Sequence, residues 1–198
     1  MRAFLGIGLP ADVREAIVSA IAQVRGLHAP VAWTAPQNLH ITLYFLGEIT
    51  PERVPLVERS MRDVASGTGP FSLSPESGGA FPGTRNPRIL WAGFLEPLEL
   101  VRQLQQNMEN ALSGIGFPRE DRPFHPHITV GRTRGALPPA WGERFVQALS
   151  GTRFGVVPVS SFTLYESRLG PGGAVYSPLC DFRLERSGRR DLREEKEP

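Results

Sequence analysis

Hydrophobic positions along this chain follow two periods, one typical of strands and the other typical of amphipathic helices. Apolar segments at 2–9 and 89–96 each end at a proline and predict strands. After each of them, apolar residues recur every three or four positions and predict a helix. The apolar helix positions are Val13, Ala16, Ile17, Ala20, Ile21 and Val24, then Val101, Leu104, Met108, Ala111 and Leu112. Gly26 and Gly114 stand where these two helices are expected to end.

The same order of elements continues in both halves of the chain. Each first helix is followed by a strand that contains the tripeptide His-Ile-Thr, at 40–42 and at 127–129. A second helix is then expected to begin near Pro51 and near Pro138. The strands expected to close each half are roughly 70–76 and 88–95, then 158–168 and 174–183. The clearest predicted loops are the glycine- and proline-rich segments 74–87 and 169–174.

One gap-free offset relates the two halves. His40 and His127 differ by 127 − 40 = 87 positions, and the same offset takes Pro10 to Pro97. Adding it once more takes the second copy of the opening strand to 175–184. Such self-similarity is the signature of an internal repeat. The sequence therefore predicts one α+β domain over 1–184 with pseudo-two-fold symmetry, built from repeats at about 1–87 and 88–174 and closed by a strand at 175–184.

Composition narrows the class of protein. Apolar residues make up 40% and charged residues 21%, as in ordinary globular proteins, and a net charge of +2 means that any basic surface has to be local. Cys180 is the single cysteine, which excludes an internal disulfide and a cysteine-based zinc cluster and fits a reducing cytoplasm. No apolar run approaches the ~18 residues of a membrane span, and the N-terminal one is too short for a signal peptide. We expect a cytoplasmic monomer with a disordered, highly charged tail at 185–198.

The two His-Ile-Thr strands carry the candidate chemistry. Because alternate side chains of a strand share a face, His40, Thr42 and Tyr44 are expected to project together, as are His127 and Thr129. Leu39, Ile41, Leu43 and Phe45 are expected to point into the core. Equivalent residues of the two halves face each other across a pseudo-two-fold axis. His40 and His127 should therefore meet in one cleft.

Paired histidines suit phosphodiester chemistry. An imidazole titrates near pH 6.5, so one copy can act as a general acid while the other acts as a general base. Hydroxyls of Thr42 and Thr129 can donate to the oxygens of a phosphate held between them. In-line displacement at phosphorus needs its attacking and leaving oxygens on opposite sides. Two groups on opposite walls of a cleft meet that need without a metal.

Other interpretations of these histidines remain open. A zinc site could use His40, His125 and His127, although no carboxylate lies within the His-Ile-Thr segments to complete it. His125 alone is more typical of a loop residue, and His28 is expected in an exposed turn. The strands could also be structural.

The motif segments resemble a known family. "LHITLYFLGE" at 39–48 and "DRPFHPHITVGR" at 121–132 are similar to the two HxTx signatures of the 2H phosphoesterase superfamily. The flanking segments "RAFLGIGLP" and "LYESRLGPGGAVYSPL" resemble one branch, the RNA 2′,3′-cyclic phosphodiesterases, also called 2′-5′ RNA ligases (LigT/ThpR). The resemblance covers about residues 1–184.

The resemblance implies a bilobal fold with antiparallel sheets, outer helices and a central active-site groove. It implies metal- and cofactor-free hydrolysis of 2′,3′-cyclic phosphates on RNA ends or nucleotides to 2′-phosphomonoesters, with reversible 2′-5′ RNA ligation as a further activity. His40 would be the proton donor and His127 the proton acceptor. Thr42 and Thr129 would bind the phosphate. Action on 2′-5′ oligoadenylate or on a small cyclic nucleotide is one alternative. A non-catalytic module that binds RNA ends is another.

Four further residues are candidates for substrate binding. Arg132 matches an arginine that commonly ends the family's second motif, but strict alternation places it on the face opposite His127. His125 stands where the family commonly has a basic residue, so its charge would depend on pH. Tyr44 and Phe124 could stack on a nucleobase.

Overall fold

The computed structural model describes residues 1–25, 29–170 and 173–185 of the 198-residue chain. The strands are β1 (Arg2–Gly8), β2 (Val31–Trp33), β3 (His40–Glu48), β4 (Phe71–Leu73), β5 (Pro75–Phe81), β6 (Ile89–Phe94), β7 (Ile128–Thr133), β8 (Val157–Val159), β9 (Ser161–Gly170) and β10 (Gly173–Arg183). The α-helices are α1 (Ala11–Arg25), α2 (Val54–Ser66), α3 (Glu99–Gly114) and α4 (Trp141–Leu149), with short 3-10 helices η1 (Pro36–Asn38) and η2 (Pro51–Arg53).

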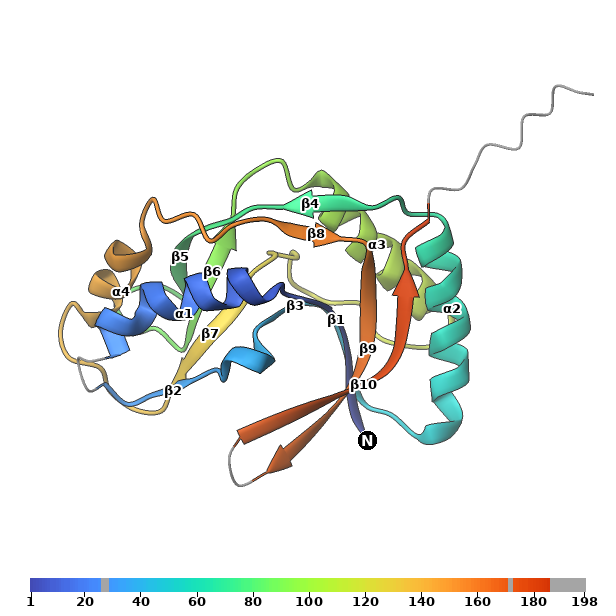
Figure 1. Ribbon diagram of the computed structural model, residues 1–198. Coiled ribbons are helices and arrows are strands. Elements are labelled where there is room, and N and C mark those ends of the chain that lie inside the picture. Colours follow the sequence, from blue (N-terminus) through green and yellow to red (C-terminus); the bar gives the residue numbers. More distant parts are fainter. Residues whose placement is uncertain (26–28, 171–172, 186–198) are drawn as a thin grey trace, which may run out of the picture.

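The main sheet runs through the whole molecule in the antiparallel order β10-β9-β1-β3-β7-β6-β5, and β2 pairs with β7. β4 and β8 form a separate pair. The sheet has two halves, which join where β3 and β7 pair through Ile41 and Ile128. Helices α2 and α3 pack against each other and contact the β10 and β3 half, while α1 and α4 pack together on the side of β5 (Figure 1). The predicted α+β class with two antiparallel halves and outer helices is confirmed.

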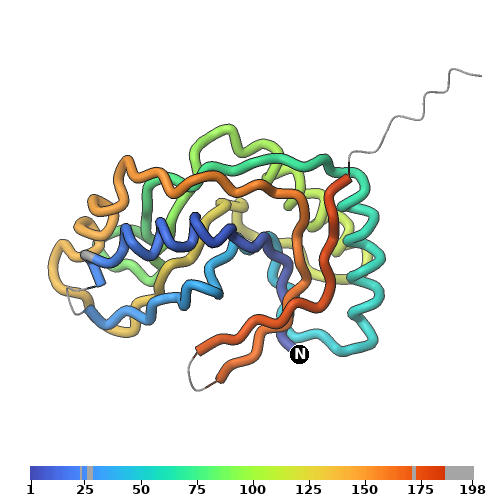
Figure 2. Tube along the Cα trace, in the orientation of Figure 1, coloured from blue at the N-terminus to red at the C-terminus, as the bar shows by residue number. Residues whose placement is uncertain are grey.

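The two lobes of the sheet do not coincide with the two predicted repeats. Equivalent elements do recur along the chain, since β1, α1 and β3 correspond in order to β6, α3 and β7. However, β5 from the first repeat pairs with β6, and β9 from the second pairs with β1. Figure 2 shows the orange trace of β9 beside the dark-blue trace of β1. The repeat boundary near residue 87 therefore stays a prediction, and each repeat supplies strands to both lobes.

One predicted loop is wrong, because residues 75–81 of the segment 74–87 form strand β5. Glycine in this strand allows close packing of a neighbouring side chain and does not form a turn. The Trp91 indole ring from β6 lies directly over Gly79, and a Cβ atom on Gly79 would overlap that ring. An irregularity between Glu76 and Gly78 also interrupts the alternation by which a strand is recognised.

Three smaller expectations concern chain ends and turns. The predicted loop 169–174 is shorter, because β9 extends to Gly170 and β10 begins at Gly173. Gly114 is the last residue of α3, and Gly116 adopts the left-handed conformation (φ 84°) instead. Gly26, His28 and the tail from residue 186 lie outside the described residues. Within the described ranges, no helix combines the length and apolar character needed to cross a bilayer.

Gly79→Ala is expected to destabilise the fold by about 1–3 kcal/mol, the usual cost of overpacking. The added methyl group would displace the Trp91 ring, which lies on the strand next to β7. Thermal unfolding followed by circular dichroism measures the loss as a lower Tm. Gly83→Ala is the matched control, because a Cβ atom at Gly83 meets no atom within 4 Å. Equal Tm values for both variants would contradict this packing role.

Candidate active site

The two His-Ile-Thr segments meet at the centre of the sheet. Ile41 of β3 and Ile128 of β7 form the pair between these strands, and both side chains are completely buried. Their sequence neighbours therefore point to the opposite face, which we call the histidine face and define by His40, Thr42, His127 and Thr129. All four side chains are partly exposed. The strands are antiparallel, so His40 lies toward Thr129 and Thr42 lies toward His127.

The two imidazole rings are held in the same way. Nδ1 of His40 lies 2.7 Å from the carbonyl oxygen of Asn38, and Nδ1 of His127 lies 2.8 Å from that of His125. A carbonyl oxygen accepts only, so each Nδ1–H donates and the neutral tautomer leaves Nε2 unprotonated. Nε2 of His40 lies 2.9 Å from Oγ1 of Thr42. Both rings can therefore exchange a proton through Nε2.

Burial and neighbouring positive charges act on the pKa values of both histidines. Burial is the main cause that lowers the pKa of His40 and the pKa of His127, because a buried imidazolium loses hydration. Hydrogen bonds to the backbone carbonyls oppose this shift. The positive charge of Arg132 lowers both pKa values further, and the charge of His127 lowers that of His40. Both imidazoles therefore favour their neutral forms more than a free imidazole does.

The predicted face of Tyr44 is wrong because β3 contains a β-bulge. Along β1, Gly6 pairs with Thr42, but the next residue, Leu5, pairs with Tyr44, which leaves Leu43 as an extra residue. The bulge turns Tyr44 into the core, where it is 2% exposed and its hydroxyl donates to the Pro118 carbonyl. Tyr44 is therefore unavailable for stacking on a nucleobase.

The same bulge turns Phe45 outward. This residue was expected in the core, but it pairs with Phe4 and is 57% exposed. The ring centroids of Phe4 and Phe45 are 6.2 Å apart, and the Phe4 ring also lies 4.8 Å from the His40 ring. Phe45 thus lies on the histidine face, in the position that the sequence analysis assigned to Tyr44.

The predicted face of Arg132 is also wrong, because β7 contains a bulge of its own. Trp91 pairs with Thr129 and Leu90 pairs with Gly131, so Val130 is the extra residue of β7. Strict alternation fails at this residue. Arg132 is exposed and pairs with Ile89 of β6. Ile89 in turn pairs with Phe81 of β5. Opposite residues share a face, and the Phe81 ring contacts that of His127 (centroids 5.3 Å apart). Arg132 therefore lies on the histidine face.

The two bulges are equivalent by sequence offset. Leu43 and Val130 differ by 87 positions, as do Phe45 and Arg132. Each bulge comes directly after the threonine of its motif. The two strands consequently present different groups at equivalent positions, an aromatic ring on β3 and a guanidinium on β7.

Aromatic rings that sequence reasoning did not identify flank both histidines. Tyr176 of β10 packs edge-to-face on His40 (5.2 Å, 81°), and Phe81 of β5 packs in the same manner on His127 (5.3 Å, 85°). Asn38 Nδ2 donates to the Ala174 carbonyl (2.6 Å) and ties β10 to the residues before the first motif. These partners come from strands distant in the sequence, so no local pattern marks them.

The remaining candidates lie at the margin of this site. His125 is exposed, its ring lies 6.5 Å from that of Phe81, and its charge lowers the pKa of His127. Phe124 is partly buried against the hydrophobic core, which leaves little of its ring for stacking. Among the residues that the structure describes, no three His, Cys, Asp or Glu side chains are arranged to hold a metal ion.

Comparison with known proteins agrees with this geometry. The chain matches the family described as LigT like Phosphoesterase over residues 7–91 and 95–176. It is 35% identical over 182 residues to the RNA 2′,3′-cyclic phosphodiesterase of Archaeoglobus fulgidus, covering 92% of this chain and 99% of that protein. The protein of the same name from Thermus thermophilus is also 35% identical, over 93% of this chain and 90% of its own length.

Solved structures show the same fold. TT0787 of Thermus thermophilus superposes with a TM-score of 0.81 at 30% identity, covering 95% of this chain and all of that one. Escherichia coli LigT complexed with 3′-AMP superposes with a TM-score of 0.71 at 30% identity, covering 92% and 97% of the two chains. With its paired His-x-Thr strands, its bilobal sheet and a family match over most of its length, this chain belongs to the LigT-like phosphoesterase family.

Proposed function

We propose that this protein hydrolyses the 2′,3′-cyclic phosphate of RNA ends or nucleotides to a 2′-phosphomonoester. The observation that carries this proposal is the pair of imidazoles on adjacent strands, each held at Nδ1 by a carbonyl and each with Nε2 available for proton transfer. The relatives that bear the name RNA 2′,3′-cyclic phosphodiesterase support the choice of substrate.

The proposed reaction uses the two histidines in opposite protonation states. His127 accepts a proton from water through Nε2, and the water oxygen attacks phosphorus. The bond between phosphorus and the ribose 3′ oxygen breaks on the opposite side, and His40 donates its proton to that oxygen. The phosphate stays on the 2′ oxygen. A 5′-hydroxyl in place of water would give a 2′-5′ linkage, and the reverse reaction would cleave it.

Three side chains hold the phosphate in this proposal. The hydroxyls of Thr42 and Thr129 donate to non-bridging oxygens, and Arg132 contributes a charge that offsets the charge developing in the transition state. His125 is a further substrate-binding residue at the rim of the site. Tyr44 and Phe124 have no role. The reaction needs no cofactor or metal, and we propose that it takes place in the cytoplasm on a monomer.

A substrate panel tests this function. The purified protein should hydrolyse adenosine 2′,3′-cyclic phosphate to adenosine 2′-phosphate and should leave adenosine 3′,5′-cyclic phosphate intact, because the proposed reaction releases a ribose 3′ oxygen while the phosphate stays on the neighbouring 2′ oxygen. Chromatography against both phosphate isomers identifies the product. Activity should persist in EDTA. Turnover restricted to 2′-5′ oligoadenylate, or tight binding of cyclic ends without product, would favour the alternative functions.

A further inference from the structure

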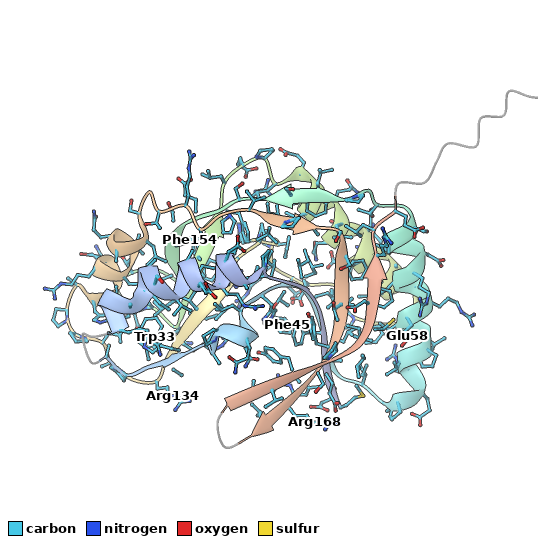
Figure 3. All side chains as sticks on the ribbon, in the orientation of Figure 1. Trp33, Phe45, Glu58, Arg134, Phe154 and Arg168 are labelled. Carbon is cyan, nitrogen blue, oxygen red and sulfur yellow. The ribbon has the colours of Figure 1, made fainter. Side chains whose placement is uncertain are left out.

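The outer ends of β9 and β10 form a two-stranded ribbon that extends past β1. β1 pairs with β9 from Thr163 to Ser167, and among the described residues the pairing of β9 beyond Ser167 is with β10 alone. Figure 3 shows the labelled Arg168 on this projecting part. Two of its side chains, Leu169 and Val175, are 78% and 58% exposed. A ribbon of two strands is marginally stable in water, so its position depends on contacts with the rest of the protein.

The side chain of Asn38 supplies such a contact. Asn38 is the last residue of η1, and its Nδ2 donates to the Ala174 carbonyl oxygen of β10 at 2.6 Å. Among the described residues, this is the one side-chain hydrogen bond that joins residues 168–176 to a part of the chain outside β9 and β10. The ribbon carries Tyr176, whose ring packs edge-to-face on that of His40 (centroids 5.2 Å apart). The amide of Asn38 therefore holds the strand that covers the proposed proton donor.

The main chain of Asn38 acts on the same imidazole. Its carbonyl oxygen accepts from Nδ1 of His40 at 2.7 Å, which leaves Nε2 for proton transfer. We propose that Asn38 is a positioning residue for His40, and that its side chain shields the imidazole from water by holding the β9–β10 ribbon in place. The proposal rests on the proposed function, in which His40 is the proton donor.

The equivalent residue of the second repeat lacks the second of these contacts. His125 stands 125 − 38 = 87 positions after Asn38, and its carbonyl accepts from His127. Within the part of the chain that the structure describes, however, the His125 side chain forms no hydrogen bond to another strand. Phe81 of β5 packs on the ring of His127 instead. Loss of the Asn38 amide should therefore affect His40 and leave His127 unchanged.

The shielding has a defined electrostatic consequence. Burial is the largest cause that lowers the pKa of His40, and the charges of His127 and Arg132 on β7 lower it further. The ring also contacts Phe4 of β1, which is uncharged, and Tyr176, whose own pKa is raised by burial, so that its hydroxyl stays neutral. Release of the ribbon would hydrate the ring and leave both positive charges in place. The pKa of His40 should therefore rise.

Asn38→Ala tests the assignment, because it removes the amide and keeps the backbone carbonyl. In the pH profile of kcat on adenosine 2′,3′-cyclic phosphate, the alkaline limb, set by His40 as acid, should move to higher pH while the acid limb stays in place. The maximal kcat should fall by as much as about 10²-fold, the loss that misplacement of a catalytic group can cause. Asn107→Ala is the matched control, because the partly buried Asn107 side chain accepts its hydrogen bond from Gln103 of the same helix, α3.

A proton NMR titration of the imidazole signals gives a second measurement that needs no turnover. The chain has four histidines, and the signal that is lost in His40→Ala identifies that ring. In Asn38→Ala the pKa of His40 should rise while that of His127 stays unchanged. Tyr176→Ala, which removes the cover itself, should raise the pKa of His40 in the same way. The double variant should add little to either single one, because both act through one contact.

Each outcome decides the assignment. A loss of kcat with both limbs and both titrations in place would show that Asn38 supports only the fold, and an unchanged profile with full activity would show that the ribbon needs no tether. Either result overturns the proposal. Wild-type protein that is inactive on the substrate would refute the proposed function, whereas a rise of the His40 pKa in Asn38→Ala and Tyr176→Ala would still support the tether. Tm values show that the variants are folded.

Discussion

His40→Ala and His127→Ala are each expected to lower kcat by about 10²–10⁴-fold, the range typical of lost acid–base catalysis. Each substitution removes one of the two Nε2 atoms that move a proton, while the Nδ1 hydrogen bonds lost with them are short-range contacts at the ends of their strands. Steady-state turnover of adenosine 2′,3′-cyclic phosphate measures the effect.

Comparison of the single and double variants serves as the control. If the two imidazoles act on one reaction step, the double variant should lose little more activity than either single variant, because residues that work as a unit are not additive. Unchanged Tm values would show that the fold is intact. A near-normal kcat in either single variant would remove that histidine from the mechanism.

Arg132→Met is expected to lower kcat/KM by about 10²-fold, because a donor aimed at the charge of the transition state is lost. It should also move the pH profile. Burial holds the pKa values of His40 and His127 below the ordinary imidazole value, and Arg132 lowers both further. Removing that charge favours both imidazolium forms, so both pKa values rise. The acid limb, set by His127 as base, and the alkaline limb, set by His40 as acid, should both shift to higher pH.

Arg134→Met is the matched control for this prediction. Arg134 is an exposed arginine two residues further along the chain, and it is not among the charges that shift the pKa of either histidine. Its loss should leave the pH profile in place. A profile for Arg132→Met that moves to lower pH, or full activity in that variant, would contradict the position of Arg132 beside the histidines.

Much of the fold followed from periodicity, because the apolar positions of each helix and strand lie where the core needs them. Val13, Ile17 and Ile21, predicted as one helical stripe, are all buried. The equivalence of the two motif strands, which pair in the structure, also followed, since the offset of 87 identified both strands before any contact was known. The family resemblance added the assignment of proton donor and acceptor, which geometry alone leaves symmetric.

The errors in the faces of the two motif strands have one physical origin. Alternation along a strand assumes an unbroken pleat, and a single extra residue reverses every position after it. Leu43 and Val130 are ordinary apolar residues, so nothing in their identity marks a bulge. The faces of Tyr44, Phe45 and Arg132 were therefore misassigned together. Each bulge is defined by pairing with another strand, β1 for β3 and β6 for β7. The pattern of apolar residues within one strand does not predict such pairing.

The crossed pairing of the strands has a consequence for synthesis of the protein. β5 completes the lobe that contains β6 and β7. β1 pairs with β9, and β9 and β10 are the last two strands along the chain. Neither half of the polypeptide contains a whole lobe. A nascent chain that ends just after the first histidine motif therefore still lacks β9, the strand that pairs with the free edge of β1. Non-local pairing of this kind is slow to form and couples the parts once formed. Both halves of the molecule should consequently mature together, at the end of translation, and lose structure together on heating.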